Sequence, residues 1–184
     1  GIPLLMVGLG LLGQRDQSLQ VLADGETLST ARALLEIFRP EEWPGFCPPT
    51  YREVPSTEGI LVLDLPDLLI TASPVEHHVP TIALKMVTKP SGSSVVYSSD
   101  TCPCESLVRL ARRADVLIHE ASGEMHGHSS ACQAGQTARQ AGVGKLYLIH
   151  YLAQTADLNA LVAYARQEFP GPVELARDFC SFEF

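Results

Sequence analysis

Short apolar runs alternate with helical segments through the second half of this sequence, and this alternation limits the possible folds more than any other feature. Strands are expected at residues 94–97, 116–119 and 145–150, and helices at 103–114, 129–141 and 157–169. The helices are expected because apolar or small residues recur there every three or four positions. Continuous apolar strands are typical of a sheet that helices cover on at least one face. The pattern predicts an α/β fold.

The first half of the chain is expected to add one helix and several strands. Apolar positions recur at helical spacing between Gly25 and Pro40, and the proline-rich stretch 39–55 is interpreted as an irregular connection. Further strands are expected at 59–65, 68–72, 81–87 and 173–176. A chain of 184 residues can bury roughly 70% of the surface that it exposes when unfolded. We therefore predict a single domain over residues 1–184.

The charge balance weighs against a large nucleic-acid footprint. Asp and Glu number 21 against 13 Lys and Arg, which gives a formal net charge of −8, whereas binding to a phosphate backbone usually needs a basic face. The apolar run at residues 2–12 is too short to span a bilayer and follows no basic export segment. Five unevenly spaced cysteines favour a reducing compartment. We expect a cytoplasmic protein with no membrane attachment.

Histidines at the ends of expected strands are the main candidates for chemistry. All six histidines lie after residue 76, His150 ends one strand, and Asp100 follows another. A single histidine at a strand end is more often a hydrogen-bonded structural residue than a ligand. Imidazole nitrogens together with a carboxylate oxygen, however, form a donor set that suits zinc. The pattern therefore favours a metal site at one edge of the sheet.

Five short segments occur in the same order as the motifs of a known family. They are VEHHVP at 75–80, YSSDT at 97–101, IHEAS at 118–122, HSS at 128–130 before an alanine-rich helix, and LIH at 148–150. They resemble the strand-His, Ser-Gly-Asp-Thr, His-Glu-Ala-Thr, His-Ser-Thr and Leu-Thr-His motifs of metallo-β-lactamase-fold hydrolases of the ribonuclease Z branch. The resemblance covers residues 58–152 well and 1–12 weakly. It implies a metallo-β-lactamase-like αββα sandwich that is incomplete at its N-terminus.

The resemblance also implies a role for each matching residue. His77 would ligate the first metal of a two-zinc site, Asp100 would bridge both metals, and His150 would ligate the second. His128 would give a proton to the leaving group, and Glu120 would support His128. The implied activity is hydrolysis of a phosphodiester or small ester by water that the metals activate.

The other three histidines are given structural interpretations. His78 is expected to be an exposed neighbour of His77 on the opposite face of a strand, and His119 is expected to pack in the core. His126 is interpreted as a solvated loop residue, although it could belong to a lid over the site.

One element of the resembling family has no counterpart in this sequence. A His-x-His-x-Asp-His loop supplies half of the family's ligands, and no such stretch occurs among the 184 residues. Residues 1–5 resemble the helix that follows the loop, so the chain is expected to begin just after it. We therefore expect the two-metal site to be partial or empty and hydrolysis by this chain to be weak. Self-association through an uncovered sheet edge is a further hypothesis.

The interval between two of the proposed ligands bears on the substrate. Residues 78–99, between His77 and Asp100, are enough for two strands and a turn. In the resembling family a long tRNA-gripping arm is inserted here. The short interval and the acidic charge favour a small or extended ester or phosphodiester over a folded tRNA.

Two other functions stay open at this point. Gly8, Gly10 and Gly13 match the spacing G-x-G-x-x-G of dinucleotide-binding domains, but residues 14–17 leave little room for the helix that this motif requires. The second alternative is a catalytically degenerate scaffold or interaction module of the same fold.

Overall fold

The structure is a computed structural model that describes residues 2–11, 18–43, 46–153 and 157–181. The chain divides into two compact units, residues 1–55 and residues 56–184, and each is described by itself. Among the described residues, no helix combines the length and the apolar character that a membrane crossing needs.

In its described residues, the N-terminal unit has two α-helices and a small parallel sheet. Its elements are α1 (Ile2–Leu11), β1 (Gln20–Ala23), α2 (Gly25–Ile37), a 3-10 turn (Pro40–Glu42) and β2 (Thr50–Glu53). The predicted helix is confirmed as α2, which buries Leu28, Ala31 and Leu35. The stretch 39–55 was expected to be irregular, but it contains β2, which pairs in parallel with β1. The mostly exposed, polar residues of β2 carry none of the apolar alternation that predicts a strand.

The glycine motif lies in a setting that excludes dinucleotide binding of the predicted kind. Gly8 and Gly10 lie inside α1, and Gly13 lies outside the described residues. The fingerprint needs its glycines in a turn between a strand and a helix, so this alternative is wrong. Asp24 has a local role instead, because its side chain accepts hydrogen bonds from the backbone N–H groups of Glu26 and Thr27 at the start of α2.

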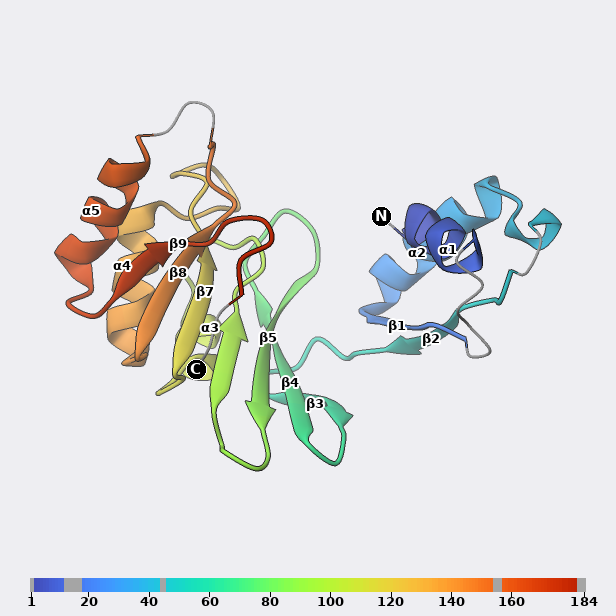
Figure 1. Cartoon of the computed structure of the whole chain (residues 1–184), viewed down its shortest axis with the longest axis horizontal. Helices are drawn as coiled ribbons and strands as arrows, with labels where there is room; N and C mark the ends of the chain where they lie inside the picture. Colours follow the sequence, from blue (N-terminus) through green and yellow to red (C-terminus); the bar gives the residue numbers. More distant parts are fainter. Residues whose placement is uncertain (1, 12–17, 44–45, 154–156, 182–184) are drawn as a thin grey trace. The chain divides into compact units, whose positions relative to one another are not determined.

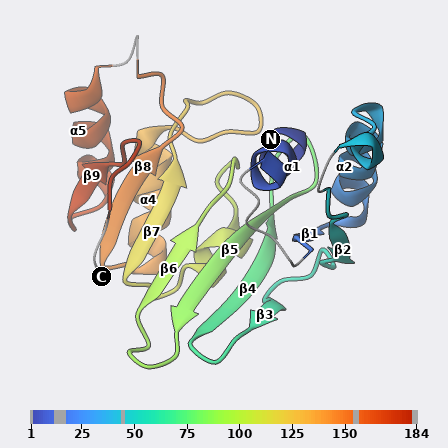
Figure 2. The same cartoon turned by 45° about the vertical axis from the view of Figure 1, so that its right-hand side comes forward.

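The C-terminal unit is built on a seven-stranded sheet with the order β3-β4-β5-β6-β7-β8-β9 (Figures 1 and 2). The strands are β3 (Ile60–Asp64), β4 (Leu68–Val75), β5 (Thr81–Thr88), β6 (Ser94–Tyr97), β7 (Val116–Glu120), β8 (Lys145–Ile149) and β9 (Val173–Leu175). Pairing is antiparallel from β3 to β6 and parallel from β6 to β9. The predicted strands of this unit are all present.

The helices among the described residues of this unit are α3 (Glu105–Leu110), α4 (Ala131–Ala141) and α5 (Leu158–Glu168). Figure 1 shows α4 and α5 beside β7, β8 and β9. The buried face of α4 is mostly alanine, and at Gly135 an added Cβ would lie 2.4 Å from the carbonyl oxygen of Ala165 in α5. Small residues therefore let α4 pack closely. Leu107, Leu117, Leu146 and Leu148 lie in the core between the helices and the sheet, and the predicted α/β fold is confirmed.

The strand directions bring four loops to one edge of the sheet. Because β5 is antiparallel to both β4 and β6, β4 runs in the same direction as β6, and β7 and β8 share that direction. The segments that follow β4, β6, β7 and β8 therefore all leave the sheet at the same edge. His77, Asp100, the end of β7 at Glu120, and His150 lie at this edge.

Candidate metal centre

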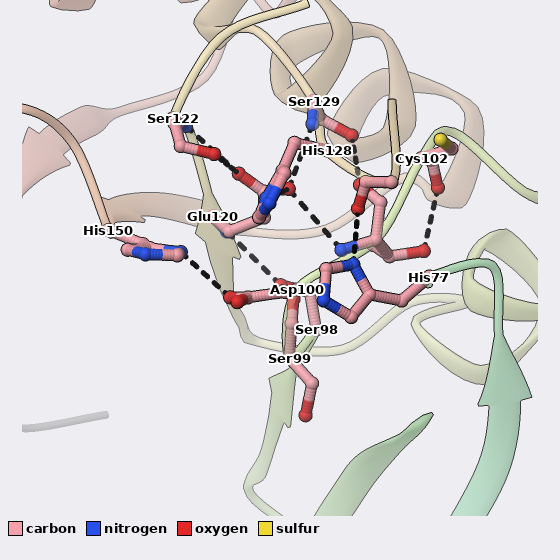
Figure 3. Close-up of polar contacts among 12 residues, drawn as sticks. His77, Ser98, Ser99, Asp100, Cys102, Glu120, Ser122, His128, Ser129 and His150 are labelled. Carbon is pink, nitrogen blue, oxygen red and sulfur yellow. Dashed lines mark hydrogen bonds and ion pairs between the residues drawn. The ribbon is translucent and has the colours of Figure 1, made fainter. Parts of the chain in front are cut away.

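Asp100 and His150 are joined directly by a hydrogen bond. Nδ1 of His150 lies 2.8 Å from Oδ1 of Asp100 (Figure 3). His150 and Ser99, which precedes Asp100, both have a positive φ, 52° and 55°. Non-glycine residues seldom adopt this conformation, and such strain gathers at functional sites. The Ser99 hydroxyl also donates to the carbonyl of Ile82 at 2.8 Å, which helps to hold this turn.

His77 is oriented by the loop between β7 and α4. Its Nδ1 lies 2.7 Å from the carbonyl oxygen of Gly127. A carbonyl can only accept, so Nδ1 carries the hydrogen and, in the neutral ring, Nε2 keeps a free lone pair. Metal-binding histidines commonly donate their other N–H group to a carbonyl in this way. The ring of His77 lies 4.9 Å from that of His128, between centroids.

Glu120 is a buried carboxylate at the centre of a hydrogen-bond network. Its oxygens accept from the backbone N–H groups of Thr101, Ser122 and Ser129, at 3.3, 2.9 and 2.8 Å, and from the Ser122 hydroxyl. Burial raises the pKa of Glu120, but the hydrogen bonds from Ser122, Ser129 and Thr101 outweigh it and hold the pKa below its usual value. The group is therefore ionised at neutral pH.

The same carboxylate fixes the orientation of His128. Nδ1 of His128 lies 3.1 Å from Oε1 of Glu120, and an ionised carboxylate can only accept, so Nδ1 carries the hydrogen. Nε2 is left to act on a substrate or a metal. The ring of His128 lies 5.6 Å from that of His150, and Figure 3 shows His77, Asp100, His128 and His150 gathered at one place.

His119 lies in the core, as the sequence predicts, and is fully buried. Its Nδ1 donates to the backbone carbonyl of Glu120 at 2.7 Å. Within the part of the chain that the structure describes, its Nε2 is a buried side-chain nitrogen without a hydrogen-bond partner. Burial lowers the pKa of His119 more than the Glu120 carbonyl and charge raise it, so the ring is neutral in the folded protein.

The buried neutral His119 predicts a loss of stability in mild acid. Below about pH 6.5 the unfolded chain protonates this histidine while the folded chain does not. Stability is fully present above that pH and falls by up to about 1.4 kcal/mol per pH unit as the pH drops toward the folded-state pKa. Urea unfolding of the wild type and of His119→Met between pH 8 and pH 5.5 measures this term. The variant should be less stable at pH 8 but have a weaker pH dependence, and equal slopes would contradict the assignment.

The candidate ligands fall into two groups that share His128. One is Asp100, His128 and His150, and the other is His77, His78 and His128; in each, the candidate ligand atoms lie within 4.8 Å of one another. Zinc takes imidazole nitrogen and carboxylate oxygen. The side chains of Asp100, His128 and His150 therefore fit zinc. The hydrogen bonds that orient His77 and His128 agree with this assignment.

His78 lies closer to these residues than the sequence indicates. Strand β4 ends at Val75, so His77 and His78 lie in the following turn and not on opposite faces of a strand. The ring of His78 lies 4.8 Å from His77, 6.0 Å from His128 and 4.7 Å from His126. His78 is exposed, as expected, but it belongs to the cluster. In the sequence, only the position of His78 next to His77 indicates that it belongs to the cluster.

One pocket borders the cluster, and another lies at the loop after β7. One, of about 510 Å³, is bordered by His150 and by residues of the C-terminal segment that include Arg177 and Asp178. The other, of about 550 Å³, is lined by Ser122, Glu124, Cys132, Tyr151 and Tyr164 among others. Of these two pockets, the one of about 510 Å³ is lined by a candidate ligand, His150. No pattern in the sequence indicates either pocket.

Comparisons with known proteins agree with this architecture. A family described as "Beta-lactamase superfamily domain" matches residues 6–151. Ribonuclease Z of Thermoplasma acidophilum is 40% identical over 100 residues, which cover 50% of this chain and 32% of that protein. The chain thus spans about a third of the length of this relative. The resemblance seen in the sequence is confirmed.

Two solved structures share the fold. Human tRNase Z, short form, matches with a TM-score of 0.70 and 22% identity over 98% of this chain and 72% of that one. Zn²⁺-bound PqqB from Methylobacterium extorquens matches with a TM-score of 0.62 and 15% identity over 96% of this chain and 69% of that one. The predicted metallo-β-lactamase-like fold is confirmed.

Proposed function

This chain belongs to the beta-lactamase superfamily, and on that premise we propose that it is a zinc-dependent, ribonuclease Z-like hydrolase of a phosphodiester or small ester. The observation that carries the proposal is the convergence of His77, Asp100, His128 and His150 at one sheet edge, with His128 bonded to the buried Glu120. Candidate ligands from four separate loops meet there. Histidines with independent structural roles are not expected to converge at one place.

Each residue has a distinct part in the proposed reaction. His77, Asp100 and His150 would hold the metal, together with any further ligands that the protein supplies. When bound, zinc would polarise the scissile group and activate water for attack. His128 would donate a proton from Nε2 to the leaving oxygen, and Glu120 would hold its ring in position and stabilise the protonated imidazole. The backbone N–H groups of Thr101, Ser122 and Ser129 and the Ser122 hydroxyl, which all donate to Glu120, keep this carboxylate ionised.

The proposed substrate is small or extended and not a folded tRNA. The interval between His77 and Asp100 holds β5, a turn and β6, so this stretch forms a hairpin and no long arm. The net charge of −8 disfavours an extended phosphate-backbone contact. The pocket of about 510 Å³ beside His150 has room for a small organic group of the substrate.

The test is zinc-dependent hydrolysis of bis(p-nitrophenyl) phosphate by the protein expressed from its full reading frame. Asp100→Asn should lower the rate by about 100-fold or more, because even partners of metal ligands contribute 10–100-fold to affinity or activity. Asp67→Asn is the matched control, since Asp67 is exposed in the turn that precedes β4, away from the carboxyl end of that strand. Equal rates in both variants would overturn the proposal. Absence of any hydrolysis, with the fold intact, would favour the scaffold alternative.

A further inference from the structure

Three imidazoles, those of His77, His78 and His128, lie close together, and two of them lie against Gly127. The candidate ligand nitrogens of His77, His78 and His128 all lie within 4.8 Å of one another. Zinc–nitrogen bonds of about 2.1 Å place two ligands of a tetrahedral ion about 3.4 Å apart, so small side-chain rotations would suffice to close the group around an ion. The group contains neither Asp100 nor His150, and the proposed hydrolase chemistry gives His78 no role.

Gly127 shapes this group in two ways. Its φ is +83°, and an added Cβ would lie 2.8 Å from Nε2 of His78 and 2.9 Å from Nδ1 of His77. Only a residue without a side chain lets the two rings approach the backbone so closely. The Gly127 carbonyl also accepts from Nδ1 of His77, which leaves the lone pair of Nε2 for a metal.

His128 can serve only one ion at a time. Its Nδ1 donates to Glu120, so Nε2 is the single nitrogen left for a metal. Yet His128 belongs both to the group with His77 and His78 and to the group with Asp100 and His150. An ion bound through His128 in one group therefore excludes an ion bound through His128 in the other.

The donor set also indicates which ions would bind. Three neutral imidazoles without a carboxylate suit zinc, copper and nickel and not magnesium or calcium, which prefer oxygen. The ring of His126 lies 4.7 Å from that of His78, so a fourth imidazole is close by. Because His78 and His126 are exposed, an ion can reach the group from solvent.

We propose that His77, His78 and His128 form a second position for a borderline divalent cation, which competes with the proposed hydrolase site because it takes His77 from the catalytic metal and His128 from the leaving group. The binding rests on these three residues alone. Its consequence rests on the proposed function: an ion at this position takes Nε2 of His128 away from the leaving group, so zinc in excess inhibits hydrolysis.

Cu²⁺ is the probe for this position, because pulsed electron paramagnetic resonance counts the imidazoles that bind it. With one equivalent of Cu²⁺, the metal-free wild type should show three. His78→Gln should show fewer and bind Cu²⁺ about tenfold more weakly or worse, since loss of a direct ligand costs at least as much as loss of its supporting partner. Asp100→Asn is the matched control and should keep the wild-type spectrum and affinity. Thermal unfolding of each variant checks that the fold is intact.

Two outcomes would overturn the inference. If His78→Gln keeps the spectrum and affinity of the wild type, Cu²⁺ does not use His78. If Asp100→Asn loses the ion and His78→Gln does not, the ion lies at the proposed catalytic position, and the proposed function still stands. If Asp100→Asn hydrolyses the substrate as fast as the wild type, the proposed function is contradicted. The Cu²⁺ spectra would still test the second metal position by themselves.

Discussion

His128→Asn should lower the hydrolysis of a phosphodiester with a poor, alkoxide leaving group by about 10²–10⁴-fold, the range that general acid catalysis contributes. The reason is the position of the ring, whose Nδ1 donates to Glu120 at 3.1 Å while Nε2 is left for the substrate. Asparagine keeps a short N–H donor for Glu120, so the buried carboxylate stays paired. The kcat of the purified variant against a methyl phosphodiester measures the effect.

The leaving group provides the control for this prediction. p-Nitrophenolate departs without being protonated, so His128→Asn should lower the hydrolysis of bis(p-nitrophenyl) phosphate far less than that of the methyl ester. A loss of the same size on both substrates would mean that His128 acts by binding metal and not by donating a proton. That result would contradict the role proposed for His128 while leaving the metal centre in place.

Glu120→Gln should destabilise the folded protein by about 3 kcal/mol. The carboxylate is fully buried and accepts hydrogen bonds from three backbone N–H groups, the Ser122 hydroxyl and His128. Hydrogen bonds to a charged group contribute about 1.5–3 kcal/mol each, and buried donors left unpaired cost a similar amount. An amide has one acceptor oxygen and presents N–H groups to these donors. Urea unfolding at pH 7.5 measures the change in the free energy of unfolding.

A nearby glutamate is the matched control for the stability measurement. Glu124 lies exposed in the loop that follows β7 and accepts a hydrogen bond from the Ser130 hydroxyl at 3.1 Å, so Glu124→Gln should change stability by less than about 0.5 kcal/mol. The pH dependence gives a second check. Because the folded-state pKa of Glu120 is below the ordinary value of 4.5, its stabilisation is present above that pH and lost as the pH falls below it. Glu120→Gln should lack this acid-sensitive part, and an unchanged acid profile would contradict the assignment.

The alternation of apolar strands and amphipathic helices was sufficient to predict the α/β fold. The positions of the site residues at the ends of strands follow from the strand topology. In the structure β6, β7 and β8 run parallel, so Asp100, Glu120 and His150 lie at one sheet edge. His77 joins them because β5 reverses the chain between β4 and β6. The roles of these residues and the single domain over residues 1–184 remain predictions.

Other features of the site depend on tertiary contacts, which the periodicity of apolar residues in the sequence does not reveal. His78 was assigned to the far face of a strand, but the strand ends before it and the turn brings its ring to His128. The close approach of Gly127 to two imidazoles depends on a positive φ, which cannot be inferred from a lone glycine. The dinucleotide-binding interpretation failed although the glycine spacing matched, because the backbone at Gly8 and Gly10 is helical.

Anomalous diffraction at the zinc edge, on crystals of the wild-type protein grown with one equivalent of zinc, tests the metal centre most directly. We predict an anomalous peak within coordination distance of Asp100 and His150, with His128 or His77 beside it. A map whose peaks all lie away from His77, Asp100, His128 and His150 would contradict the proposal that this sheet edge is a metal centre.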